Sequence, residues 1–111
     1  MIYIEGGTKT QQQLAKDLYY FCSQVLAIKK LVDIDLKIKP VEGAQAWTDH
    51  EGEGKFYIDI EQSLSASQFI TAFCHEMIHV IQHLRDKPIS EKEAYKLEVG
   101  LAERFKPLNK S

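Results

Sequence analysis

The chain has few cysteines. Its 111 residues include only two, Cys22 and Cys74, which lie far apart in the sequence. They form neither the close-spaced ligand pattern of a zinc finger nor the framework of a disulfide-rich domain. We expect both to be small buried side chains within helices, and we expect the protein to reside in the reducing cytoplasm.

Blocks of charge and long apolar runs are also missing. The sequence has 14 basic and 16 acidic residues for a net charge of −2, with no basic-aromatic repeat. This composition predicts no intrinsic binding to nucleic acid. Residues Met1 to Glu5 lack the basic and apolar segments of an export signal, and no apolar stretch is long enough for a bilayer. We therefore expect no membrane insertion, and a single domain over residues 1–111.

The first half of the chain predicts one helix and then a small sheet. Thr10 and Gln13 form a capping-box pattern, and apolar residues then recur at helical spacing, which predicts a helix from about 10 to 30. Residues 33–39 alternate polar and apolar, as a strand with one buried face does. Segments 43–48 and 55–61 flank a glycine-containing loop and predict a hairpin. Residues 2–4 can add a further short strand.

Two helices are predicted in the second half. Ser65 and Gln68 form a capping box before a strongly apolar helix that reaches Leu84. Ser90 and Glu93 offer another, before a last helix that extends up to Pro107. Gly100 lies inside that last helix, where it costs about 1 kcal/mol relative to Ala and can allow close packing.

The apolar helix contains the motif His75-Glu76-Met77-Ile78-His79, an HExxH pattern. On a helix, positions i and i+4 lie about 40° apart and about 6 Å along the axis, so both imidazoles can reach one ion. Glu76 then projects beside the metal, where it can deprotonate a metal-bound water. The motif predicts a zinc hydrolase, although a buried helix with histidines bonded to backbone or water is the alternative.

A catalytic zinc usually has three protein ligands, so a third must come from elsewhere. His83 continues the i, i+4 series, but three such positions span about 12 Å and cannot converge on one ion. Glu91 and Glu93 lie on the next helix, which a short turn folds back antiparallel on the first. Either carboxylate can face the histidines.

The HExxH motif followed by Glu91-Lys92-Glu93-Ala94 resembles the gluzincin metallopeptidases, whose third ligand lies in an E-x-x-A or E-x-x-x-[DN] pattern. This resemblance favours Glu91 as the ligand and leaves Glu93 as the capping partner of Ser90. Tyr95 occupies the position where the family commonly has Asp or Asn, a departure that affects the usual contact behind the ligands. Short phage-encoded proteins classed as peptidases share the trailing E-x-E-A-Y.

The upstream half resembles the same proteins. Segments 43–47 and 55–60 are similar to the edge strand and its neighbour in thermolysin, SprT-like and immunity-repressor-cleaving peptidases, and the resemblance covers about residues 33–105. It implies that a peptide or protein substrate pairs with the edge strand near Gln45–Trp47. The implied fold class is α+β: an N-terminal helix, a small antiparallel or mixed sheet of about three strands, an active-site helix and a C-terminal glutamate helix.

The expected function is that of a zinc-dependent metallopeptidase with His75, His79 and Glu91 as Zn²⁺ ligands and Glu76 as general base. Tyr95 is the first candidate for stabilising the oxyanion, and His83 is the second. A chain this short offers one wall of a cleft, so an adaptor can be required to complete the site. The alternative function is a non-catalytic zinc-containing regulatory or protein-binding module of phage or mobile-element type, and a structural domain with an accidental motif is the third reading.

Overall fold

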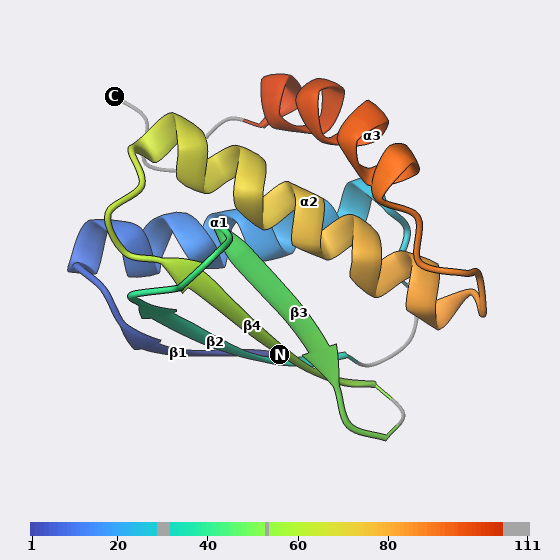
Figure 1. Cartoon of the computed structure of the whole chain (residues 1–111), viewed down its shortest axis with the longest axis horizontal. Coiled ribbons are helices and arrows are strands. Elements are labelled where there is room, and N and C mark those ends of the chain that lie inside the picture. The colour runs from blue at the N-terminus through green and yellow to red at the C-terminus, as the bar shows by residue number, and fades with distance from the viewer. Residues whose placement is uncertain (29–31, 53, 106–111) are drawn as a thin grey trace.

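In the described part of the chain, four strands form one mixed sheet, and three helices lie on one side of it (Figure 1). The computed structural model describes residues 1–28, 32–52 and 54–105. The strands are β1 (Ile2–Gly6), β2 (Asp33–Lys39), β3 (Ala46–His50) and β4 (Lys55–Glu61). The helices are α1 (Lys9–Val25), α2 (Ala66–Leu84) and α3 (Glu91–Arg104). The α+β class is confirmed, but the sheet has four strands where about three were predicted.

The strand order is β1-β2-β4-β3. Strands β1 and β2 are parallel, as are β2 and β4, whereas β3 and β4 form the antiparallel hairpin that the sequence predicts. The fourth strand is β1, the short segment that the sequence left as a possibility. Because β1 and β2 are parallel, the chain must cross over between them, and α1 makes that crossover. Strand β3 is left at an edge of the sheet.

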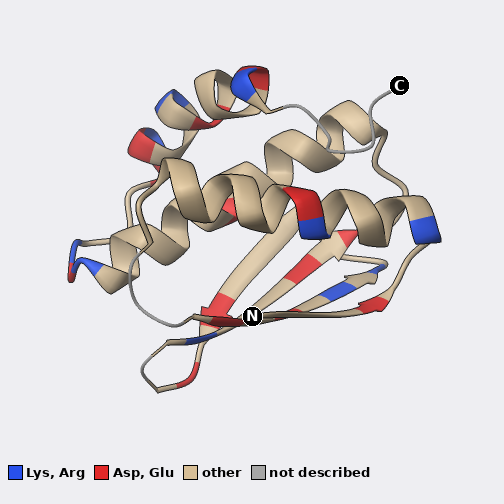
Figure 2. Cartoon of the chain, turned by 180° about the vertical axis from the view of Figure 1, so that it is seen from behind, with Lys and Arg blue, Asp and Glu red and all other residues tan. Residues whose placement is uncertain are grey.

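Successive side chains along β2 and β4 point alternately to the face covered by the helices and to the opposite face, which carries charged residues. Buried residues of β2 and β4 point toward the helices; they are Ile34, Leu36, Ile38, Phe56, Ile58 and Ile60. The intervening residues include Asp35, Lys37 and Asp59, and Figure 2 shows such charges along the strands. Thr48 of β3 pairs with Ile58 and therefore lies on the face toward the helices. This register places Thr48 opposite α2.

Helix α1 differs from its prediction at both ends. Its N-cap is Thr8, whose hydroxyl accepts from the Gln11 amide while Gln11 reaches back to the Thr8 amide, so the predicted Thr10–Gln13 box is wrong. The helix ends at Val25 rather than near residue 30. Ala27 has φ of +52°, a left-handed conformation that a right-handed helix cannot contain. Residues 29 and 30, at the predicted end, lie outside the described residues.

Helix α2 lies over the sheet beside α1 and contributes more residues to the hydrophobic core than any other element (Figure 1). Its predicted capping box is present, because Ser65 and Gln68 bond each other's backbone amides. Glu76 is its only Asp, Glu, Lys or Arg residue, and it is buried. In the part of the chain that the structure describes, no helix has the combination of length and apolar character needed to cross a bilayer.

Helix α3 packs on α2 rather than on the sheet, and Ala94 and Leu101 are buried at that contact. The predicted third capping box is only half formed. Ser90 accepts from the Glu93 amide, but its own amide donates to the side chain of Gln82 instead of that of Glu93. The helix ends at Arg104, and the predicted end at Pro107 lies outside the described residues.

Candidate metal centre

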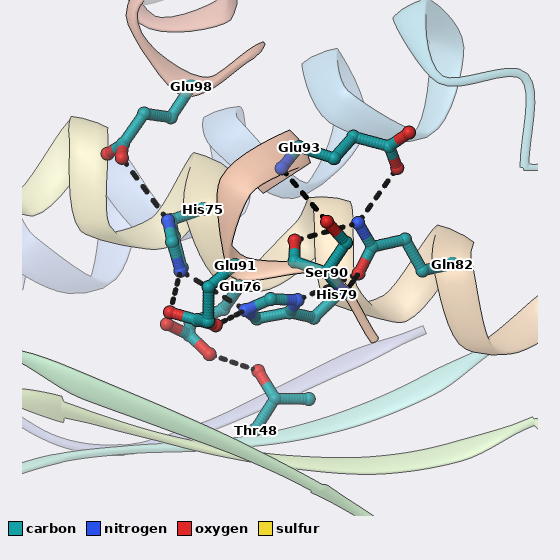
Figure 3. Close-up of polar contacts among 9 residues, drawn as sticks. All are labelled: Thr48, His75, Glu76, His79, Gln82, Ser90, Glu91, Glu93 and Glu98. Carbon is teal, nitrogen blue, oxygen red and sulfur yellow. Dashed lines mark hydrogen bonds and ion pairs between the residues drawn. The ribbon is translucent and has the colours of Figure 1, made fainter. Parts of the chain in front are cut away.

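Helices α2 and α3 bring three potential metal ligands to one point (Figure 3). His75 and His79 are one turn apart on α2, and their Nε2 atoms lie 3.1 Å from each other. Glu91 begins α3, with its carboxylate oxygens 3.4 Å from His75 Nε2 and 2.5 Å from His79 Nε2. We call these three residues the metal triad.

The metal triad has donor atoms close enough together to hold a metal ion, and zinc is one ion that accepts such donors. Ligand atoms that lie about 2.0–2.1 Å from a tetrahedral zinc are roughly 3.3 Å apart. The His75–His79 and His75–Glu91 distances of 3.1 and 3.4 Å are close to that value, whereas the His79–Glu91 distance of 2.5 Å is shorter. Two imidazoles with one carboxylate is also the ligand set of one class of catalytic zinc site. Among the described residues, the metal-ligand grouping contains neither His83 nor Glu93. That these residues hold zinc stays a prediction.

Glu76 lies beside the metal triad without joining it (Figure 3). Its Oε1 accepts a hydrogen bond of 2.6 Å from the hydroxyl of Thr48 on β3. Burial raises the pKa of the Glu76 carboxyl above its usual value, while the Thr48 bond and the two imidazoles oppose the rise. An oriented, desolvated carboxylate of this kind is suited to accept a proton. Thr48 was not predicted from the sequence, because its contact with Glu76 depends on the strand register.

The metal triad lies in a cleft of about 570 Å³ between β3 and the two helices. One wall is formed by β3 and the preceding residues 43–45. This is the edge with which a peptide substrate was predicted to pair. Among the described residues that line the cleft are three glutamates of α2 and α3 but no Lys or Arg. The described lining therefore offers no permanent cation to bind a free carboxylate.

The two candidates for oxyanion stabilisation both line this cleft. The ring of Tyr95 is exposed and its centroid lies 4.8 Å from that of His75. The ring of His83 lies 3.8 Å from that of His50 and meets Phe56 edge-on, so it belongs to an aromatic cluster at the far end of the cleft. Tyr95 is thus the candidate whose ring lies next to a residue of the metal triad.

Three polar residues behind the metal triad have roles that the sequence did not indicate. Glu98 Oε1 lies 3.3 Å from His75 Nδ1, and Gln82 Oε1 lies 2.9 Å from His79 Nδ1. Glu93 accepts a hydrogen bond of 2.8 Å from Gln82, so it contacts the site only through that amide. The contact of Glu98 with His75 could not be predicted from its position two turns after Glu91, because it depends on how α3 is rotated on α2.

The two cysteines are buried between α1 and α2, with their Sγ atoms 3.9 Å apart. The contact with Cys74 and burial both raise the pKa of the Cys22 thiol, which keeps it protonated. Both residues therefore serve here as small core side chains.

We compared the chain with protein-family models, curated proteins and solved structures. These comparisons find no significant match, so the assignment of function depends on the geometry of the cleft alone.

Proposed function

We propose that the protein is a zinc-dependent metallopeptidase of the gluzincin type. The observation that carries this proposal is the convergence of the His75, His79 and Glu91 donor atoms, all within 4.8 Å of one another, next to a carboxylate that does not join them. A site that only stores metal has no need of that separate carboxylate. A hydrolase needs it as a base.

A zinc ion in such a site supplies a Lewis acid that polarises a carbonyl and lowers the pKa of water toward about 7. The remaining work falls to the chain itself. Glu76 accepts the proton of the attacking water and returns it to the leaving amine, and the Thr48 hydroxyl holds its carboxylate in place. Tyr95 is placed to donate a hydrogen bond to the oxyanion, since it lines the cleft beside His75.

The substrate in this proposal is an extended peptide or protein segment. Strand β3 bonds β4 on one side only, so its other edge offers backbone donors and acceptors along the cleft. A peptide that pairs with this edge near Gln45–Trp47 would lie across the metal triad. The position of Thr48 supports this arrangement, because one strand both orients the base and presents the edge.

The test compares four proteins for zinc content and for cleavage of an unfolded fluorescent casein: wild type, Glu76→Gln, His79→Ala and the exposed control Glu103→Gln. We expect wild type and Glu103→Gln to bind one zinc and cleave. Glu76→Gln keeps the size of the side chain and an oxygen for Thr48, so it should keep zinc and lose roughly 10²–10⁴-fold in rate. His79→Ala should lose both.

The outcomes separate the alternatives. Stoichiometric zinc without cleavage by the wild type would favour the non-catalytic zinc module. Equal cleavage by wild type and Glu76→Gln would refute the role of the base. Equal, sub-stoichiometric zinc in wild type and His79→Ala would refute the metal site itself.

A further inference from the structure

The rear nitrogens of both triad histidines have buried polar partners (Figure 3). Glu98 and Gln82 are 8% and 1% exposed, and each directs an oxygen at an Nδ1 atom of His75 or His79. Burying a carboxylate and an amide costs free energy unless their hydrogen bonds are made. The two contacts therefore satisfy the hydrogen-bonding needs of buried polar side chains, unlike chance contacts between exposed residues.

The orientation of the Gln82 amide is fixed by its other contacts. Its Nε2 donates to the Ser90 carbonyl at 3.2 Å and to Glu93 Oε1 at 2.8 Å, and both of these groups can only accept. Its Oε1 accepts from the Ser90 amide at 3.3 Å. A reversed amide would oppose like groups at all three contacts. The oxygen therefore faces His79, and His79 Nδ1 must donate.

Glu98 orients His75 in the same way, because its carboxylate oxygen lies where it can accept a hydrogen bond from Nδ1. With Nδ1 as the donor, Nε2 of each imidazole is the atom that can offer a lone pair to a metal ion. The two Nε2 lone pairs face each other across 3.1 Å, with the Glu91 carboxylate beside them. Three electron-rich donors at this spacing repel one another unless a cation lies among them.

We propose that Glu98 and Gln82 are positioning residues that hold both imidazoles in the metal-binding tautomer. This proposal rests on the metal site of the proposed function. Glu98 acts from α3 on His75. Gln82 acts on two ligands at once. It contacts His79 directly, and it forms hydrogen bonds with the backbone carbonyl and amide of Ser90, the residue before Glu91. Glu93, which the sequence offered as an alternative ligand to Glu91, accepts a hydrogen bond from the Gln82 amide and so helps to orient it.

The experiment measures zinc affinity by competition with a chromophoric chelator, using zinc alone as the probe. Glu98→Met and Gln82→Met keep the length of each side chain and remove its acceptor oxygen. We expect each to weaken zinc binding roughly 10–100-fold, the usual effect of losing such a partner. Glu98→Gln keeps an oxygen but loses the charge, so its loss should be smaller yet measurable. The exposed residue Glu103 on the same helix gives the control Glu103→Met, which should match wild type.

Thermal unfolding with chelator present separates positioning from simple stability. A merely structural role would lower the stability of the metal-free protein and leave the affinity of folded molecules unchanged. Wild-type affinity in folded Glu98→Met and Gln82→Met would overturn the proposal. If neither Met variant folds, the zinc affinity of Glu98→Gln provides the test. Wild-type affinity in Glu98→Gln would then overturn the proposal. Failure of the wild type to bind zinc would instead refute the metal site of the proposed function.

Discussion

At the scale of single residues, Thr48 is the side chain whose removal gives the most informative result. It is the described hydrogen-bond partner of Glu76 and comes from a different element. Thr48→Val keeps the shape and removes the donor, which should raise the pKa of Glu76 further, because that bond lowers it. Glu76 acts as a base only when ionised, so the acidic limb of the pH–rate profile should move to higher pH.

Peptide cleavage measured against pH tests this prediction, with Thr48→Ser as the control that keeps a hydroxyl. The rate at neutral pH should fall about tenfold in Thr48→Val, with zinc affinity unchanged. An identical profile in the two variants would mean that Thr48 only packs beside Glu76.

Tyr95 is a second residue whose role can be isolated. Its ring packs near His75, while its hydroxyl is the only part that can donate to an oxyanion. Tyr95→Phe keeps the ring, so we expect zinc affinity to stay constant and the rate of cleavage to fall roughly 10²-fold. Unchanged cleavage would transfer the role to His83, where His83→Gln should then show the loss.

At the scale of the elements, the turn between β1 and α1 depends on a glycine. Gly6 has φ of +81°, and a Cβ at this position would overlap the carbonyl oxygen of Ile38 on the neighbouring strand. Gly43 has a similar φ of +75° but open space around it. Gly43→Ala should therefore cost only the left-handed strain of about 1–2 kcal/mol, whereas Gly6→Ala should cost ~3 kcal/mol or more. Chemical denaturation of the two variants measures the difference, and equal costs would contradict it.

Gly100 gives the opposite expectation within α3. The sequence suggested that this glycine allows close packing, but a Cβ built on it meets nothing within 4 Å. Nothing in the surrounding structure therefore requires the glycine, and Gly100→Ala should stabilise the protein by about 0.5–1 kcal/mol. Urea denaturation measures the gain. A loss of stability would show that the helix needs the glycine for a reason outside its described contacts.

The elements also show where local sequence pattern is sufficient. Residues 33–39 alternate strictly and form β2 with the predicted bounds, and the Ser65–Gln68 box starts α2 where expected. Helix α1 was extended too far because Ile28 continues the apolar stripe, although Ile28 packs against the core from the connection that follows the helix. Apolar spacing does not distinguish a buried helix residue from a buried loop residue.

Some residues of the candidate site could likewise be predicted from local sequence pattern, and others could not. The i, i+4 geometry of His75 and His79 is local to one helix, so the sequence was sufficient to predict their approach. Thr48, Gln82 and Glu98 depend on the strand register and on the rotation of α3, which no local pattern encodes. Glu93 was weighed as a ligand because spacing places it near Glu91, but the contact with Gln82 directs it elsewhere.

At the scale of the whole molecule, the metal triad joins two helices of very different character. Helix α2 has one Asp, Glu, Lys or Arg residue and is buried on most sides, whereas α3 has seven and is largely exposed. Helix α3 therefore contributes little apolar area of its own. A metal that bonds Glu91 to His75 and His79 would hold α3 on α2.

Removal of metal should accordingly lower the stability of the protein as a whole. Zinc at 100 times its dissociation constant contributes about 2.7 kcal/mol, which for a chain of this size corresponds to a rise in Tm of about 10 °C. Calorimetry with zinc or with a chelator checks the value, and Glu91→Gln should reduce the rise sharply. A Tm that does not respond to zinc in the wild type would contradict the prediction.

The alternation of inward and outward side chains along the two interior strands sets a rule for how this chain can change in length. Loss of one residue from within β4 would reverse the facing of every later position in the strand, so that Ile58 or Ile60 would meet water. Loss of two would shorten the strand and keep the facing. Length variants of this protein should therefore change β2 and β4 by even numbers of residues, and single-residue insertions should be confined to connections such as residues 40–45.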